Sequence, residues 1–229
     1  MQQPAVQATQ QIVVQNQQNF NSSARLFPQN GLELQKMQSQ DLPSDLRNLY
    51  LGFSYKSLST KTGFIQKLVS AQSVDIDMDL SVMLFDRQGN FVETVTALVQ
   101  RSRDGACYHY GNNGESRGGD SEMISIALAS LDPGISFITV VAGSSKGHKF
   151  DLLEHSQLRI KNQEGMIALA NQQLSNNEDK PSCILVILCK MNGYWSYQAL
   201  EQYDKAQNIL DLRSVCQNWV RFVGSSKLS

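Results

Sequence analysis

Long apolar runs, paired cysteines and a strong net charge are all missing from this 229-residue sequence. The longest apolar run, Cys183 to Cys189, has seven residues, whereas a helix needs about 20 to cross a bilayer. No basic segment followed by an apolar stretch stands at the N-terminus, so we expect no secretory signal. We therefore expect a globular, cytoplasmic protein without a membrane span.

The four cysteines, Cys107, Cys183, Cys189 and Cys216, form no CxxC pair, and only three histidines are present. Structural zinc needs clustered Cys and His ligands, so we expect reduced core thiols and no zinc site. Twenty basic residues nearly cancel 21 acidic ones, which leaves a net charge of −1. The chain thus lacks a global basic field that would indicate a nucleic-acid or anionic-lipid partner.

The first thirty residues differ in composition from the rest. Glutamine fills 12 of the first 40 positions, where charge is limited to Arg25, Glu33 and Lys36. Such a segment offers little apolar surface to offset its ordering entropy. We therefore predict a flexible Gln-rich arm over residues 1–30 and one domain over residues 31–229. The arm is either a solvated tail or a segment that orders against a partner through Ile12, Val13, Val14, Phe20, Leu26 and Phe27.

The rest of the chain has the pattern of a mainly β protein. Apolar and polar residues alternate from Ile76 to Val82, which predicts a half-buried strand. Asn192-Gly193 is the favoured type I′ turn dipeptide and predicts a hairpin between residues 183–190 and 194–197. Short strands separated by turns favour a two-sheet β-sandwich, and we predict further strands at 91–99, 123–128, 135–141, 158–161 and 166–169.

One amphipathic helix is predicted at the C-terminus. Apolar residues recur there at three- and four-residue spacing and form one stripe, which is typical of a helix packed on a core. Asn208 or Asp211 is the expected cap at its start. The stripe consists of Leu212, Val215, Cys216, Trp219, Val220 and Val223.

The acidic triplet Asp75, Asp77 and Asp79 is the most informative motif. In a strand these three side chains share one face, at intervals of ~6.6 Å. Their carboxylates repel one another unless water or a cation such as Ca²⁺ offsets the charge. Two interpretations stay open: a calcium site, and a solvent-facing strand in which the acidic residues only provide solubility.

A second motif is the Gly-, Asn- and acid-rich loop between His109 and Glu122. Oxygen ligands on a glycine-rich backbone suit a hard cation, because glycine adopts the positive φ angles that wrapping an ion requires. The spacing is not that of an EF-hand, and no G-K-[ST] follows the glycines as in a P-loop. An ordinary mobile surface loop is the alternative.

Together these motifs resemble the TerD family of tellurium-resistance and stress-response proteins, which has eukaryotic relatives described as cAMP-binding proteins. The similarity is colinear from about Gly31 to Val223. It consists of the Leu32–Lys36 and Leu49–Gly52 segments, the acidic triplet, Asp104-Gly105, His109, Gly111, the Gly/Asp-rich loop, the apolar segment Phe137–Val141 and Asn192-Gly193-Tyr194-Trp195.

The resemblance implies a β-sandwich in which Ca²⁺ binds where the two acidic segments meet. By position, the implied metal ligands are Asp75, Asp77, Asp79, Asn113, Asp120 and Glu122. The chain departs from the family pattern at several points. Asn112 replaces an aspartate of the family loop, and Gly52-Phe53-Ser54 and Val141-Ala142-Gly143 replace Gly-Trp-Asp and Ile-His-Asp. The resemblance therefore implies one calcium site or none.

No nucleophile–base set for catalysis is visible in the sequence, so we expect a non-enzyme. The leading hypothesis is a TerD-like, calcium-binding stress-response module that interacts with other proteins. One alternative is a structural or assembly subunit with a decayed calcium site, whose Gln-rich arm mediates self-association or partner binding. Another is a nucleotide sensor, in which Arg101, Arg103 and Arg117 pair with a phosphate.

The arm hypothesis predicts that a chain shortened to begin at Asn30 keeps its melting temperature but loses self-association. The physical reason is that Ile12–Val14 has high strand propensity and Phe20 and Phe27 are large apolar anchors, so the arm fits an edge strand or groove of another subunit. Size-exclusion chromatography with light scattering measures the assembly. Unchanged assembly after truncation would make the arm a solvated tail.

Overall fold

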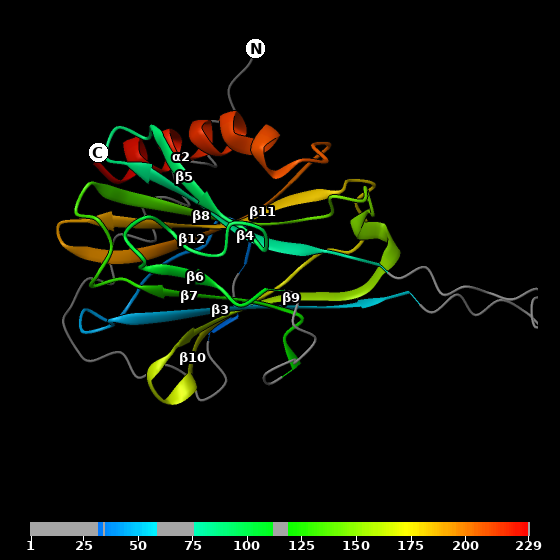
Figure 1. Ribbon diagram of the computed structural model, residues 1–229, viewed down its shortest axis with the longest axis horizontal. Coiled ribbons are helices and arrows are strands. Elements are labelled where there is room, and N and C mark those ends of the chain that lie inside the picture. The colour runs from blue at the N-terminus through cyan, green and yellow to red at the C-terminus, as the bar shows by residue number, and fades with distance from the viewer. Residues whose placement is uncertain (1–31, 34, 59–75, 112–118, 229) are drawn as a thin grey trace, which may run out of the picture.

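The structure is a computed structural model that describes residues 32–33, 35–58, 76–111 and 119–228. Within these ranges two six-stranded sheets pack face to face, and a C-terminal helix forms a third layer (Figure 1). The β-sandwich predicted from the sequence is confirmed. The predicted arm, residues 1–30, lies outside the described residues and stays a prediction.

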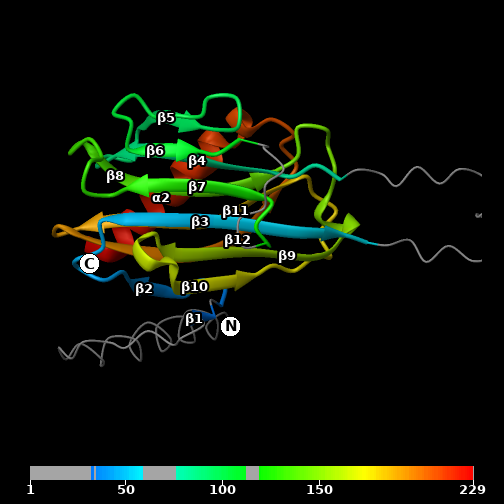
Figure 2. The ribbon, with the colours of Figure 1, turned by 60° about the horizontal axis from the view of Figure 1, so that its bottom comes forward.

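The first sheet, here the β3 sheet, has the order β1-β10-β9-β3-β7-β6. Its pairs are antiparallel except for β1 with β10, which is parallel. Figure 2 shows this sheet in front of the helix. Its strands are β1 (Leu32–Glu33), β3 (Asn48–Ser57), β6 (Cys107–His109), β7 (Glu122–Ala127), β9 (Leu153–Asn162) and β10 (Ile167–Gln173).

The second sheet, here the β8 sheet, has the order β2-β12-β11-β8-β4-β5 and is antiparallel throughout. Its strands are β2 (Ser39–Asp41), β4 (Asp79–Asp86), β5 (Phe91–Val95), β8 (Ile135–Gly143), β11 (Ser182–Met191) and β12 (Tyr194–Asp204). Three short 3-10 helices and one α-helix complete the described elements: η3 (Phe150–Leu152), η4 (Glu164–Met166), η5 (Ile209–Leu212) and α2 (Arg213–Leu228).

The predicted C-terminal helix is confirmed as α2, which covers the outer face of the β8 sheet (Figure 1). Cys216, Val220 and Val223 of its apolar stripe are buried in a second hydrophobic cluster with residues of β4, β8 and β11. Asn208 is a cap, but of η5 rather than of α2: its Oδ1 accepts a hydrogen bond from the Leu210 amide at 2.9 Å.

Strand β4 changes character along its outer face, and this change positions the candidate site. Its inward residues Leu80, Val82 and Leu84 are buried between the sheets. Its outward residues are apolar at Met83 and Phe85, which lie in the cluster under α2. The outward residues nearer the start of the strand, Asp79 and Ser81, are polar and line a cavity instead. The strand starts at Asp79 rather than at Ile76 as predicted.

The predicted Asn192-Gly193 turn is confirmed. Met191 pairs directly with Tyr194, so the hairpin between β11 and β12 has a two-residue turn. Both turn residues have positive φ, 52° for Asn192 and 84° for Gly193, as a type I′ turn requires. Trp195, the next residue but one, is only 8% exposed, which confirms that it faces the interior.

The cysteines are core thiols, as predicted: all four are free and buried. Burial raises the pKa of the Cys107 and Cys216 thiols to about 12, so neither is a thiolate near neutral pH. Among the described residues, no helix has the length and apolarity that crossing a membrane requires.

Candidate functional site

The charges of three predicted metal ligands act on one tyrosine hydroxyl, that of Tyr55. Tyr55 on β3 donates a hydrogen bond to the carbonyl of Ile76 and accepts one from the amide of Met78, both at 3.2 Å. Burial raises the pKa of Tyr55, and the negative charges of Asp77, Glu122 and Asp79 raise it further. The structure therefore brings the acidic segment before β4 close to the first residue of β7.

Asp77 and Asp79 keep the orientation that period-two alternation predicted. Ile76, Met78 and Leu80 are buried in the core between the sheets, whereas Asp77 and Asp79 are half-buried. The Asp77 carboxylate forms an ion pair with Lys146, with 3.0 Å between Nζ and Oδ2. The third member of the triplet, Asp75, lies outside the described residues, as does Asn113.

Glu122 is buried beside His109, which connects the two sheets. His109 Nδ1 accepts a hydrogen bond from the Gly111 amide at 2.9 Å, so the ring proton sits on Nε2. Nε2 lies 2.9 Å from the carbonyl oxygen of Leu80, to which it donates, and 3.3 Å from Glu122 Oε2. Because the Leu80 carbonyl is nearer, the imidazole does not give Glu122 a full hydrogen bond.

The Glu122 carboxylate is short of partners for its negative charge. Within the described residues its buried Oε2 accepts no hydrogen bond. Burial raises the pKa of Glu122; the nearby His109 side chain and the Leu80 backbone oppose the rise, and the Asp79 charge adds to it. A proton or a cation at this oxygen would therefore lower the free energy of the folded state.

Asp120 is in a different environment, on the outer face of the β3 sheet. Arg159 contacts its Oδ1 through Nε at 2.7 Å and through Nη2 at 2.6 Å. Tyr50 donates a hydrogen bond to its Oδ2 at 3.0 Å, and the carboxylate is fully buried. Burial and this carboxylate raise the pKa of Tyr50. The charge of Asp120 is thus offset by an arginine of the same chain.

Gly52 is required for this arrangement. A Cβ atom added at Gly52 would lie 2.3 Å from Asp120 Oδ2, far inside van der Waals contact. Glycine at this position of β3 therefore leaves the space that the carboxylate occupies. No sequence pattern pointed to the partner Arg159, because it lies 39 residues from Asp120 and becomes its neighbour only when β9 pairs with β3.

The described residues do not complete a metal centre by themselves. Among them, no group of three or more His, Cys, Asp or Glu side chains is placed to hold a metal ion. Of the six predicted ligands, three act electrostatically on Tyr55, one is paired with Arg159 and two lie outside the described residues. The predicted calcium site is thus neither confirmed nor contradicted.

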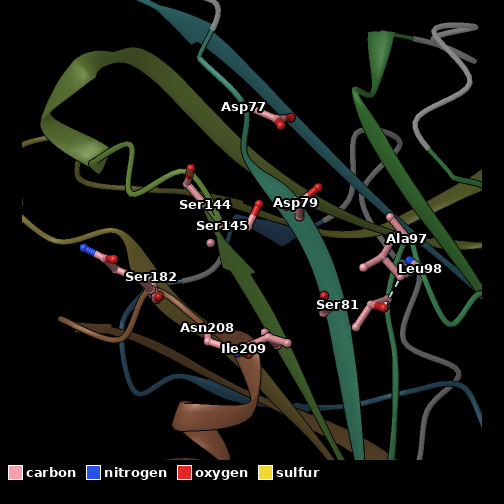
Figure 3. A pocket seen from close by; sticks show the side chains of 13 residues that line it. Asp77, Asp79, Ser81, Ala97, Leu98, Ser144, Ser145, Ser182, Asn208 and Ile209 are labelled. Carbon is pink, nitrogen blue, oxygen red and sulfur yellow. Dashed lines mark hydrogen bonds between the residues drawn. The ribbon is translucent and has the colours of Figure 1, made fainter.

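A cavity of about 420 Å³ lies next to this acidic group, on the outer face of the β8 sheet where α2 no longer covers it. Figure 3 shows Asp79 and Ser81 along β4, with Ser144 and Ser145 to one side and Leu98 to the other. Sequence reasoning found only the two aspartates of this cavity. The other lining residues come from separate segments and form no local motif: Ser81, Thr96, Ala97, Leu98, Gly143, Ser144, Ser145, Ser182, Gln207, Asn208 and Ile209.

Replacing Arg159 by Met tests whether the buried pair with Asp120 stabilises the fold. We expect a loss of about 3 kcal/mol in the free energy of unfolding, because an unpaired charge would stay buried. Adding Asp120→Asn should recover most of the loss, since no charge then needs a partner. The control, Lys56→Met, breaks the exposed pair with Glu154 and should cost under about 1 kcal/mol. Urea unfolding followed by tryptophan fluorescence measures each variant; equal losses at both pairs would contradict the prediction.

Glu122→Gln should raise the melting temperature at neutral pH in the presence of a chelator. Because the pKa of Glu122 is raised from its ordinary 4.5, the folded state binds this proton more tightly than the unfolded state. The resulting stability is fully present below pH 4.5 and is lost as the pH rises through the raised pKa. The advantage of the variant should therefore grow with pH across that window. Melting curves of both proteins measure it, with exposed Glu164→Gln as the control; a pH-independent difference would refute the prediction.

Comparison with known proteins identifies the family of the chain. The TerD domain family matches residues 31–217. The tellurium resistance protein TerZ of Serratia marcescens is 27% identical over 172 residues, which cover 75% of this chain and 88% of that protein. The stress response protein SCP2 of Bacillus subtilis (strain 168) is 23% identical over 195 residues, which cover 80% of this chain and 98% of that protein.

A solved structure shares the fold. The crystal structure of a homologue of the telluride resistance protein TerD from Streptomyces coelicolor A3(2) matches with a TM-score of 0.55 and 13% sequence identity, over 73% of this chain and 95% of that one. The family match covers well over half of the sequence and includes both acidic segments. The chain belongs to the TerD family.

Proposed function

We propose that this chain is a non-enzymatic calcium-binding module of a stress response, which interacts with a protein partner through the end of the sandwich that holds the ion. Asp77, Asp79 and Glu122 would bind the ion together with Asp75 and Asn113 from the segments outside the described residues. Asp120 is the predicted ligand that we leave out of this set, because Arg159 and Tyr50 already hold its fully buried carboxylate, whereas the lysine that pairs with Asp77 is exposed and could give way to an ion.

The observation that carries the proposal is the buried Oε2 of Glu122, which accepts no hydrogen bond within the described residues. The neighbouring charges of Asp79 and Asp77 are negative as well, and Lys146 pairs with Asp77 from an exposed position. Ca²⁺ takes six to eight oxygen ligands, mainly carboxylates, carbonyls and water. A site made of carboxylates and an amide oxygen suits Ca²⁺ better than it suits softer metal ions, which prefer nitrogen or sulfur ligands.

The proposed role in a stress response rests on the names of similar proteins. One matching protein is named for tellurium resistance and another for a stress response. Within the described residues we identify no arrangement of nucleophile and base that would support an enzyme, and burial keeps the Cys107 and Cys216 thiols protonated. A module that changes its stability and surface when an ion binds is consistent with both names.

A second candidate is a structural or assembly subunit whose calcium site has decayed. The contact between Asp120 and Arg159 favours it, because an arginine supplies at that position the positive charge that an ion would otherwise supply. In this case the Gln-rich arm, not the acidic end, would carry the interaction. The two candidates differ in one measurable property, the response to calcium.

The calcium proposal predicts that about 1 mM Ca²⁺ raises the melting temperature relative to a chelator. An ion that binds only the folded state stabilises it by RT ln(1 + [L]/Kd), about 2.7 kcal/mol at a hundredfold excess over Kd. Calorimetric titration gives the affinity directly. Asp79→Asn combined with Glu122→Gln should abolish the rise.

Exposed Asp45→Asn, at the other end of the sandwich, is the matched control and should leave the rise unchanged. If the unaltered protein melts identically in Ca²⁺ and in chelator, and calorimetry detects no binding, the calcium proposal fails and the second candidate replaces it. Mg²⁺ at the same concentration separates a calcium site from general screening of the carboxylates.

A further inference from the structure

The cavity beside β4 is lined by many groups that form hydrogen bonds, set in a largely apolar surface. Five of its residues carry a hydroxyl group, two a carboxylate and two a carboxamide. They come from β4 and the segment just before it, the segment after β8, β11, the segment after β5 and the segment before η5, so the cavity is assembled from five parts of the chain (Figure 3). Its volume of about 420 Å³ lies within the ~300–1,000 Å³ range of small-molecule sites.

The lining chemistry disfavours two common classes of ligand. None of the described lining residues is Lys, Arg or His, so a phosphate or carboxylate would meet Asp77 and Asp79 without a compensating cation. Lys146, near the rim, already pairs with Asp77. Among the lining residues that the structure describes, none is aromatic either, so they offer a planar base or ring no surface on which to stack.

The hydroxyl groups of the lining act both as donors and as acceptors. Thr96 Oγ1 accepts hydrogen bonds from the amides of Leu98 and Val99, at 3.2 and 3.0 Å. Ser144 Oγ likewise accepts one from the His148 amide at 3.1 Å. Since a hydroxyl that accepts in this way keeps its own proton, both can donate into the cavity.

Acceptors complement these donors. Ser182 Oγ donates to the carbonyl of Ala206, so its lone pairs are what it offers to the cavity. The carboxylates of Asp77 and Asp79 only accept when ionised. A ligand matches such neighbouring donors and acceptors when its own groups can both donate and accept hydrogen bonds. Each hydroxyl group of a sugar or sugar alcohol does so. A polyamine, which only donates, would leave the donors of Thr96 and Ser144 unmatched.

An apolar edge completes the match. Leu98 is 96% exposed, so its side chain is open to contact with a ligand, and Leu98 and Ile209 are both lining residues. Sugars and sugar alcohols carry C–H groups between their hydroxyls, and an aliphatic side chain at the rim can cover them.

We propose that this cavity binds a polyhydroxylated small molecule, a sugar or sugar alcohol, through Asp79, Ser144 and the neighbouring hydroxyl groups, with Leu98 covering its C–H face. The inference goes beyond the proposed function and does not require calcium. Because Asp77 and Asp79 belong to both proposals, the test is made in a chelator, where a failure of calcium binding has no effect on the result.

The test is a titration of the full chain, in EDTA, with glucose, sorbitol and myo-inositol in turn, followed by two-dimensional amide NMR. We expect saturable shifts at the amides of Leu98, Ser145 and Asn208 with at least one of the three. Spermidine and inorganic phosphate are the comparison ligands. Shifts with spermidine or phosphate but with none of the polyols would overturn the proposal, and so would the absence of any saturable shift.

Ser145→Trp places a large side chain in the cavity from an exposed position and should weaken polyol binding by roughly tenfold or more, about 1.4 kcal/mol. Ser130→Trp, the same change at an exposed serine before the other end of β8, should leave binding unchanged. Leu98→Ala against Val99→Ala forms a second matched pair at exposed positions, should a tryptophan variant fail to fold. Binding that survives both Ser145→Trp and Leu98→Ala would refute the site.

Discussion

The hydrogen bond from His109 to the Leu80 carbonyl fixes the geometry on which both candidate sites depend. It crosses from β6 in one sheet to β4 in the other at 2.9 Å, in an environment without solvent exposure. A buried hydrogen bond of this kind is costly to leave unmade. It therefore sets where β4 begins relative to β7, and so how far Asp79 lies from Glu122. The imidazole proton that serves this bond is not available to Glu122.

Asp120 and Glu122 both bury a carboxylate near the start of β7, and the surrounding residues treat the two negative charges differently. Asp120 contacts Arg159 and Tyr50, so its charge is offset within the chain. Glu122, two residues later, has a histidine whose proton is directed elsewhere and an aspartate whose charge repels it. A protein that needed only stability would gain from a neutral residue at Glu122. The unbalanced charge is thus the feature that most requires an external proton or cation.

The sequence predicted the architecture well because local rules governed it. Strand alternation, the Asn192-Gly193 turn and the stripe of α2 each depend on residues close together in the chain. The candidate site was only partly predictable. The Asp77 and Asp79 face follows from strand periodicity, but the pairing of Asp120 with Arg159 depends on the register of β3 with β9, which no local pattern encodes. The cavity was unpredictable for the same reason, since its serines come from segments that meet only when β4, β8 and β11 pair in the sheet.

The two proposals share the polar part of the outer face of β4, which begins where α2 no longer covers the strand. Under α2 the outer face of the strand is apolar at Met83 and Phe85, and beyond it Ser81 and Asp79 are left for other partners. Asp79 lies within electrostatic reach of Glu122 and also lines the cavity. A cation that uses its lone pairs and a polyol that donates to them would compete for one carboxylate. Coupling between two binding equilibria is reciprocal. The ion would therefore lower the affinity of the cavity for the polyol by the same factor as the polyol lowers the affinity for the ion.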